Sequence, residues 1–344
     1  MSDVSVKTCP SCGGRMVFHP ESKEMKCDSC GGFHPVEYDK KQDTAVRNTY
    51  SQELAECSCQ SCGAQVCAQN EVISLGCPYC GNPLVISSRV SDRFKPDGIV
   101  PFAFYSDEAM RLFQNYTKKL WFVPKQLKQN VKPGDFRAMY APFYLYDFDV
   151  SSEVGKSGKT GLMEVHKLPI DASTNFPDEL MDNISPYDYQ KMTAFSSDYL
   201  RGFLGEVYNE NSGDFIPRAR QMVQKTFDSY AAIELDKLPG HKADDMTLET
   251  RRVYYVLLPV YLFSIDYLGK RYFFAVNGQT GKVAGNLPYE TSLKRMSKIM
   301  ALLIWLFFGL PALAFAIFIL IFAVLGAQNL DQISNMLNNL SASL

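Results

Sequence analysis

The sequence has few of the residues and motifs on which common enzymes depend. It contains only four histidines, and the two in its central part, His166 and His241, do not form a metalloprotease pattern. It has no nucleophile elbow and no Rossmann glycine motif. The stretch GKSGKTG at 155–161 resembles a phosphate loop, but that motif requires glycine where this chain has Glu153. We therefore expect a polar hairpin loop at this stretch and a protein that is not an enzyme.

We also expect no secretory signal. The chain begins with the polar stretch MSDVSVKTCP, which contains no apolar segment of the kind that directs export. We expect its ten cysteines to lie in a reducing compartment, where thiols bind metals more often than they form disulfides.

Eight of the ten cysteines form a repeated pattern. Each copy reads Cys-x2-Cys, fourteen residues, Cys-x2-Cys, and the second copy lies fifty positions after the first. Two residues between cysteines let a tight turn direct both sulfur atoms at one cation, and two such turns complete a tetrahedral site. The predicted ligands are Cys9, Cys12, Cys27 and Cys30 in the first copy and Cys59, Cys62, Cys77 and Cys80 in the second.

The residues around these cysteines indicate zinc ribbons. A glycine follows each pair, where a left-handed backbone would turn amide groups toward sulfur; these glycines are Gly13, Gly31, Gly63 and Gly81. The segments between the pairs turn near HPESK and QNE, so we expect each module to be a small β-hairpin. Modules this short depend on metal for folding, and we expect two zinc ions in all. A disulfide framework and iron in a rubredoxin-like site are the alternatives.

Two cysteines and two histidines near the ribbons fall outside the pattern. Cys57 lies close enough to Cys59 in the sequence to compete for the metal, whereas Cys67 is expected to act as a small apolar residue within a hairpin. His19 and His34 adjoin prolines, and the first ribbon already has four thiolates. We expect both histidines to be surface or turn residues.

Residues 299–327 contain no charged side chain, and as a helix they would span about 43 Å. This length exceeds the roughly 30 Å of a bilayer core, so we expect one transmembrane helix. Pro311 and Gly309 predict a kink, with a re-entrant hairpin as the alternative. Lys294, Arg295 and Lys298 precede the span, and the seventeen residues after it contain no Lys or Arg. The positive-inside rule then places the N-terminus in the cytoplasm and the C-terminus outside.

The middle of the chain predicts an antiparallel α+β domain. Helices are expected from Ser106 and near Pro217, and strands over 139–150, 252–267 and 270–285, with a hairpin turn at NGQTG. The stretches APFYLYDFD and LPVYLFSID resemble each other, which suggests two related strands in one sheet. Their prolines are expected at edges or bulges. Asp149 and Asp266 end these stretches and are expected to be solvated unless the strands are neighbours.

Charge decides which partners the ribbons are expected to bind. Residues 1–90 carry eight basic and ten acidic side chains, a poor footprint for nucleic acid, which is bound by clustered Lys and Arg. We expect the ribbons to bind protein, and a membrane-tethered nucleic-acid binder is the alternative. The predicted docking surface is the part of the hairpins' apolar side chains that does not cover each ribbon's own core. The candidates are Met16, Val17 and Phe18 in the first ribbon and Val72, Ile73 and Leu75 in the second, and we expect a polar change at Phe18 or Ile73 to lose the partner.

Several phrases together resemble one family. The cysteine motifs, FKPDGIVPFAFYSDEA, YAPFYLYD, LPIDASTNFPDELMDNISPYDY and FAVNGQTGKVAGNLP are similar to the YdjG-like, TFIIB-type zinc-ribbon membrane proteins of Gram-positive bacteria. The resemblance covers nearly the whole chain. It implies a membrane-anchored, non-enzymatic component of an envelope-stress system, associated with SPFH-type and PspA-like proteins.

The predicted organisation is therefore an α+β multidomain protein. Its parts are zinc ribbon 1 (1–45), zinc ribbon 2 (46–91), an α+β domain (92–290), a basic flank (291–298), a transmembrane helix (299–327) and a short extracytoplasmic tail (328–344). The predicted role is a membrane-anchored adaptor that recruits soluble proteins to the cytoplasmic membrane.

Overall fold

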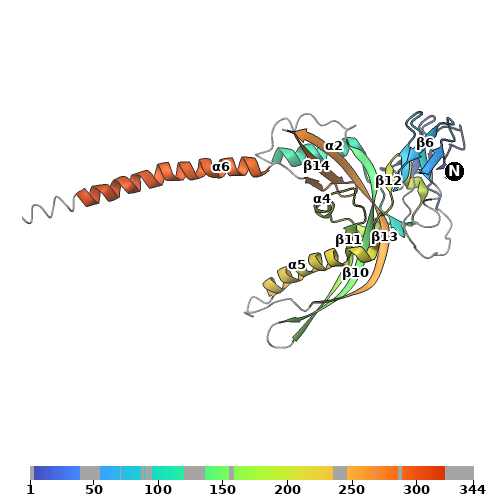
Figure 1. Cartoon of the computed structure of the whole chain (residues 1–344). Coiled ribbons are helices and arrows are strands. Elements are labelled where there is room, and N and C mark those ends of the chain that lie inside the picture. Colours follow the sequence, from blue (N-terminus) through green and yellow to red (C-terminus); the bar gives the residue numbers. More distant parts are fainter. Residues whose placement is uncertain are drawn as a thin grey trace, which may run out of the picture. The chain divides into compact units, whose positions relative to one another are not determined.

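A computed structural model describes most of the chain (Figure 1). The described residues are 4–38, 55–69, 71–86, 89, 95–119, 136–154, 159–234, 246–267, 269–285 and 289–321. The chain divides into two compact units. The first comprises residues Met1–Leu120 and Pro124–Asn286, and the second comprises Trp121–Val123 and Leu287–Leu344.

The first unit contains fifteen described strands and several helices. The strands are β1 (Val4–Ser5), β2 (Met16–His19), β3 (Glu24–Cys27), β4 (Phe33–His34), β5 (Ala55–Ser58), β6 (Gln65–Ala68), β7 (Val72–Gly76), β8 (Pro83–Ile86), β9 (Gly98–Ile99), β10 (Arg137–Val154), β11 (Lys159–Asp171), β12 (Leu204–Glu206), β13 (Thr247–Tyr267), β14 (Lys270–Asn277) and β15 (Val283–Gly285). The helices are α2 (Ser106–Lys119), α4 (Asp178–Asn183) and α5 (Ile216–Glu234), with short turns η2 (Tyr189–Lys191), η3 (Ser197–Leu200) and η4 (Ser212–Phe215).

Ten of these strands form one mixed sheet. Its order is β1-β8-β7-β12-β10-β13-β14-β15, with β11 also paired to β10 and β9 also paired to β13. Most pairs are antiparallel, while β10–β12 and β9–β13 are parallel. The predicted class is confirmed: two four-cysteine modules, a mixed sheet with helices, and one apolar C-terminal helix.

Strands β10 and β13 form the centre of the sheet, and helices cover both of its faces. Ala141, Phe143 and Leu145 of β10 pack with Leu180 and Met181 of α4 in one apolar cluster. The alternate tyrosines of β10 point the other way: the hydroxyls of Tyr144 and Tyr146 donate to the carbonyls of Glu210 and Ser212, just before α5. Both α2 and α5 begin where the sequence predicted, at Ser106 and next to Pro217.

The two similar stretches are neighbouring strands related by a local two-fold pattern. Ala141 and Leu258, the first residues of the two stretches, lie directly opposite each other in the β10–β13 pair. The elements β9, α2, β10 and β11 follow one another in the same order as β12, α5, β13 and β14. Each half also gives its first strand to the other half, because β9 pairs with β13 and β12 with β10. The expectation of two related strands in one sheet is therefore confirmed.

The expected edge position of the two prolines is wrong, because Pro142 and Pro259 lie in the central pair. In a strand, the nitrogen and the carbonyl of one residue face the same neighbour. The Pro142 carbonyl accepts from the N–H of Ala172, and the Pro259 carbonyl accepts from the N–H of Gly278. Both proline nitrogens therefore face away from the partner strand, at the gap between two shorter strands, so the central ladder loses no hydrogen bond.

The described part of the second unit, residues 289–321, is one long helix. A candidate membrane span runs over Met296–Ile321, with mean hydropathy 2.6, and none of it is buried within the chain. The helix comprises α6 (Tyr289–Ile304), within which the span begins, the π-helical turn η5 (Trp305–Gly309) and a further helical stretch to Ile321. The N–H of Leu310 bonds to the carbonyl of Trp305, five residues back, and this wider turn comes just before Pro311, whose ring and missing N–H disturb regular helices.

This helix supports one part of the sequence prediction and leaves other parts untested. It continues through Gly309 and Pro311 as a single candidate span, in place of the re-entrant hairpin. The side chains of Lys294 and Arg295, residues 322–327 of the predicted span and the tail at 328–344 lie outside the described residues.

Candidate metal centres

The eight predicted cysteines form two clusters. Within each cluster all four sulfur atoms lie within 4.8 Å of one another. The clusters are Cys9, Cys12, Cys27 and Cys30, and Cys59, Cys62, Cys77 and Cys80, with the first cysteine of every pair buried and the second exposed. Each group can hold a metal ion, as the spacing predicted.

The sulfur distances fit a tetrahedral thiolate site. With metal–sulfur bonds of about 2.3 Å, the edge of such a tetrahedron is about 3.8 Å. The sulfur atoms of Cys9 and Cys30 are 3.8 Å apart, and those of Cys12 and Cys27 are 3.5 Å apart. In the second cluster, the corresponding pairs are 3.7 Å and 3.9 Å apart. These thiols are free and too far apart for disulfides, whose sulfur atoms lie about 2.05 Å apart.

The knuckle glycines have the predicted conformation. Gly13, Gly31, Gly63 and Gly81 have φ values of 72°, 74°, 73° and 71°. Each donates its N–H to the carbonyl of the first cysteine in its pair. This turn brings the next amide toward the second sulfur: the N–H of Gly14 bonds to Cys12, and that of Asn82 bonds to Cys80. The turns at Cys12 and Cys80 therefore present backbone donors to their ligands.

These donors favour the thiolate form of one buried cysteine in each cluster. The backbone N–H of Cys30 lowers the pKa of Cys27 to about 6, with a further donor at Ser29. Burial opposes ionisation of Cys77, but the N–H groups of Cys80 and Tyr79 outweigh it and lower the pKa to about 7. The N–H of Gly14 acts in the same direction on Cys12, and that of Asn82 on Cys80, but burial and the neighbouring thiols raise the pKa of each of these two cysteines to about 12. Metal binds the thiolate, so a cation at either site would displace the proton from these thiols.

The two modules differ in their strand pairing. In the first ribbon, β2 and β3 form the predicted hairpin, and β4 joins as a third strand. In the second ribbon, β6 pairs with β5, while β7 pairs with β8 on one side and β12 on the other. The expected β6–β7 hairpin is absent from the described pairings. Strands β7 and β8 of the second ribbon are instead part of the main sheet, while β5 and β6 form a separate two-stranded sheet.

The residues near the ligands also differ from expectation. His34 Nε2 lies 3.6 Å from the sulfur of Cys9, so this histidine touches a ligand, contrary to the prediction of a surface or turn role. The corresponding position in the second ribbon is Leu84, which is fully buried. His19 is in the predicted turn, where its Nδ1 accepts from the N–H of Ser22.

The two remaining cysteines can be placed only in part. Cys57 is buried, and its sulfur lies 3.2 Å from the carbonyl of Val66, to which it donates. It is not a member of the second cluster. The side chain of Cys67 lies outside the described residues.

Of the predicted docking residues, Met16, Phe18 and Ile73 are buried, whereas Val17, Val72 and Leu75 are partly exposed. Phe18 is 1% exposed and Ile73 is fully buried. The first packs against the middle of the chain and the second lies in β7 of the main sheet. Their expected role as exposed partner-binding residues is therefore wrong, because each ribbon uses them to attach to the rest of its own unit.

The carboxylates at the strand ends do not meet. The strands β10 and β13 are neighbours, but because they are antiparallel, Asp149 lies opposite Glu249 and Asp266 lies opposite Arg271. Asp149 pairs with Arg251 at 2.6 Å and Asp266 with Arg271 at 3.0 Å, all partly exposed. Both aspartates are solvated, as expected. Residues 155–158 of the GKSGKTG loop and His241 lie outside the described residues.

A buried ion cluster that sequence reasoning missed joins three elements. Arg218 of α5 lies 2.9 Å from Asp171 at the end of β11 and 2.7 Å from Asp182 of α4. Burial raises the pKa of Asp171 to about 6, although Arg218 acts in the opposite direction. The aspartates are far apart in sequence from Arg218, and only the fold brings them together. The cluster fixes α4 and α5 relative to the sheet.

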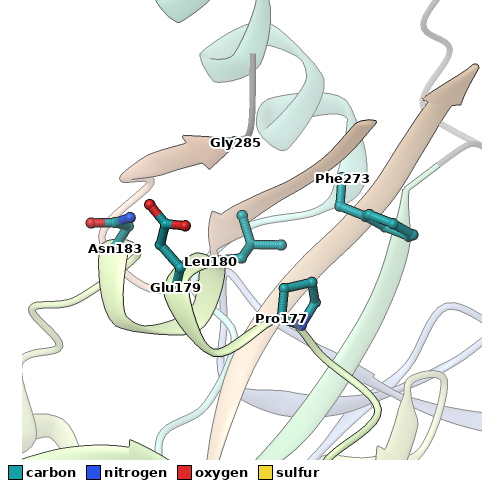
Figure 2. A pocket seen from close by; sticks show the side chains of 6 residues that line it. All are labelled: Pro177, Glu179, Leu180, Asn183, Phe273 and Gly285. Carbon is teal, nitrogen blue, oxygen red and sulfur yellow. The ribbon is translucent and has the colours of Figure 1, made fainter. Parts of the chain in front are cut away.

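Figure 2 shows a small pocket beside α4, lined by Pro177, Glu179, Leu180, Asn183 and Phe273. Its volume is about 100 Å³. Pockets that bind cofactors or drug-sized ligands hold roughly 300–1,000 Å³, so this one is too small for such a molecule. A wider pocket of about 730 Å³, with Arg137, Glu206 and Arg271 among its lining residues, has room for such a molecule. The cysteine clusters remain the best-supported functional sites, because in each of them four ligand atoms converge within 4.8 Å.

Together, the fold and these sites define a class of protein: two four-cysteine ribbons built onto an α+β domain, with a candidate membrane span near the C-terminus. The sequence is 31% identical over 308 residues to "Uncharacterized protein YdjG" of Bacillus subtilis (strain 168), covering 81% of this chain and 89% of that protein. The chain belongs to the YdjG family. No family model matches the sequence, and no solved structure matches it.

Proposed function

We propose that this protein is a membrane-anchored zinc-ribbon adaptor, without enzymatic activity, that recruits soluble proteins to the cytoplasmic membrane. The observation that carries the proposal is the combination, in one chain, of two four-thiolate sites and one long exposed apolar helix. Structural metal sites with four cysteines stabilise small recognition modules and leave no open position for catalysis. The apolar helix would hold these modules at a bilayer.

Zinc is the metal that this donor set fits best. Four thiolates at tetrahedral spacing bind zinc, and iron is the chemical alternative. The residues that would hold the two ions are the two cysteine quartets, and each ion would supply folding free energy to its ribbon. Metal analysis of the purified protein should give two zinc ions per chain; a single ion, or iron, would contradict this assignment.

The flanks of the helix support an orientation with the ribbons in the cytoplasm. Lys294, Arg295 and Lys298 precede the span, and no Lys or Arg lies in the seventeen residues after 327. A reporter fused after Leu344 that fluoresces only in the cytoplasm should stay dark. Bright fluorescence would place the C-terminus inside.

Protein partners are favoured over nucleic acid because residues 1–90 carry more acidic than basic side chains. Family resemblance suggests SPFH-type and PspA-like proteins of the envelope-stress response as partners. With Phe18 and Ile73 buried, the exposed aromatic side chains of the ribbons are the better docking residues. Tyr79, at the tip of a second-ribbon knuckle, is 73% exposed, and Phe33 of the first ribbon is 47% exposed.

Affinity purification from detergent-solubilised membranes, with and without nuclease, tests the adaptor role. We expect the same co-purifying proteins in both samples, and their loss in Tyr79→Ser or Phe33→Ser variants that keep both metals and the membrane location. Loss of the partners after nuclease treatment would favour the membrane-tethered nucleic-acid binder.

A further inference from the structure

The first ribbon packs against the middle of the chain through the aromatic side chain of Phe18. The ring of Phe18 lies 5.0 Å from that of Tyr199 in an edge-to-face arrangement and 6.4 Å from that of Phe203. The N–H of Phe18 also donates to the carbonyl of Arg201 at 3.0 Å. The hairpin strand β2 is therefore held against residues 196–203 by its side chain and its backbone.

One buried carboxylate also binds both flanks of the same ribbon. Asp198, whose side chain is 4% exposed, lies 2.6 Å from the ammonium group of Lys7 and accepts the N–H of Glu37 at 3.0 Å. Arg201 pairs with the other oxygen of Asp198 at 3.2 Å and donates to the carbonyl of Ser5. Asp198 and Arg201 thus bind the chain just before the first cysteine of the ribbon and shortly after its last cysteine.

These contacts depend on a geometry that the first metal site can impose. Lys7 and Glu37 lie outside the segment between Cys9 and Cys30, whose sulfur atoms are 3.8 Å apart. An ion bound by Cys9 and Cys30 closes this loop and holds its two ends close together. The chain segments that leave these ends, with Lys7 and Glu37, can then both reach the Asp198 carboxylate. The ribbon's own strands are four, four and two residues long, too little to hold the loop closed without metal.

We propose that the metal at the first site controls the docking of the first ribbon on residues 196–203. With the ion bound, the ribbon covers Tyr199 and Phe203, which are 3% and 7% exposed. Without it, the ribbon detaches and uncovers this aromatic surface together with the Asp198 carboxylate. Because this surface binds Phe18 and Lys7 when the ribbon is docked, the uncovered surface would bind an aromatic side chain that lies near a basic one. This inference goes beyond the adaptor role and does not depend on any partner.

Hydrogen–deuterium exchange of the full-length, metal-loaded protein in detergent micelles tests the proposal. In a Cys27→Ser/Cys30→Ser variant, which loses the first ion, we expect the amides of residues 196–203 to exchange at least about tenfold faster. The central strands β10 and β13 should exchange as in the unmodified protein, which shows that the domain remains folded.

A second variant breaks the docking without touching the metal site. Lys7→Ala removes the ammonium group that Asp198 holds, so it should speed exchange in residues 196–203 while metal analysis still finds both ions. Lys23→Ala, an exposed lysine in the turn of the same ribbon, is the matched control and should change neither. Unchanged exchange at 196–203 after loss of the first ion would overturn the proposal, as would equal acceleration by Lys7→Ala and Lys23→Ala.

Discussion

The two ribbons have matching cysteine geometry but are attached to the rest of the chain by different kinds of interaction. The second ribbon is continuous with the main sheet, because β7 pairs with β12 and β8 pairs with β1. The first ribbon forms its own three-stranded sheet and docks through Phe18, Lys7 and its flanks on residues 196–203. A sequence repeat can thus give one module that is part of the domain and one that is held on it by side chains.

The difference has an energetic consequence. Strand pairing places residues of the second ribbon in the interior of the unit, where Ile73, Leu84 and Val85 are fully buried. Losing the metal there disturbs one side of the sheet, whereas losing it from the first ribbon releases a peripheral module. The metals should therefore differ in what they stabilise, the second ion the whole unit and the first ion one docked part.

The largest expected effect compares the two metal sites directly. Cys77→Ser/Cys80→Ser should lower the free energy of unfolding by on the order of 5 kcal/mol, because it combines loss of a metal with exposure of buried apolar side chains. Cys27→Ser/Cys30→Ser should cost only about 1–2 kcal/mol in the same transition, since the ribbon detaches before the unit unfolds. Urea unfolding followed by far-UV circular dichroism measures both. Equal losses would show that the two ribbons are integrated to the same degree.

The sequence predicts those features of the two ribbons that depend on residues close together in the chain, and it does not predict contacts between distant residues. The grouping of eight cysteines into two clusters, the conformation of the four knuckle glycines, the helix starts and the long apolar helix follow from local spacing, and the structure agrees with these predictions. Phe18 was misassigned because an apolar residue in a hairpin looks the same whether it faces solvent, its own core or another domain. The β1–β8 pairing joins Val4 to Ile86, and the sequence contains no local signal for a contact of this length.

The prolines and His34 show the same limit. Pro142 and Pro259 were expected at edges because proline cannot donate to a ladder, and only the position of the neighbouring short strands reveals that no donor is needed. His34 follows the last cysteine of its ribbon by four residues, and its contact with Cys9 depends on how β4 folds back along β3.

The next effect tests the seam between the second ribbon and the sheet. A Cβ atom at Gly205 of β12 would lie 2.7 Å from the Ser74 hydroxyl and 3.0 Å from Ile73 Cγ1, both in β7. The added methyl group of Gly205→Ala should therefore push β7 away from β12 and lower the free energy of unfolding of the unit by about 1–3 kcal/mol. Gly76→Ala in the same ribbon is the control, because nothing lies within 4 Å of its added methyl group. The same urea transition reports both, and equal effects would locate the weak point elsewhere.

A smaller effect should distinguish the metal sites by their surroundings. A neutral His34 imidazole that donates its Nε2–H to the Cys9 thiolate would reduce the charge on that sulfur and hold it in place. His34→Leu introduces the residue type found at the matching position 84 and should weaken metal binding at the first site by about tenfold. Competition with a chromophoric chelator measures this, and the second site serves as the internal control. An equal change at both sites would show that the histidine acts on the fold instead of on its neighbouring ligand.

The smallest expected effect concerns a polar contact between the two cysteine modules. Arg15 of the first ribbon donates to Asp28 at 2.6 Å and to the carbonyl of Gly81 in the second ribbon at 3.0 Å. The Arg15 and Asp28 side chains are 41% and 35% exposed, so water and salt screen the pair. Arg15→Ala should cost less than about 1 kcal/mol in the urea transition, and the difference should shrink further in high salt. A loss of several kcal/mol that persists in high salt would mean that the ribbons support each other directly, and the first ribbon could then no longer be regarded as a module that detaches on its own.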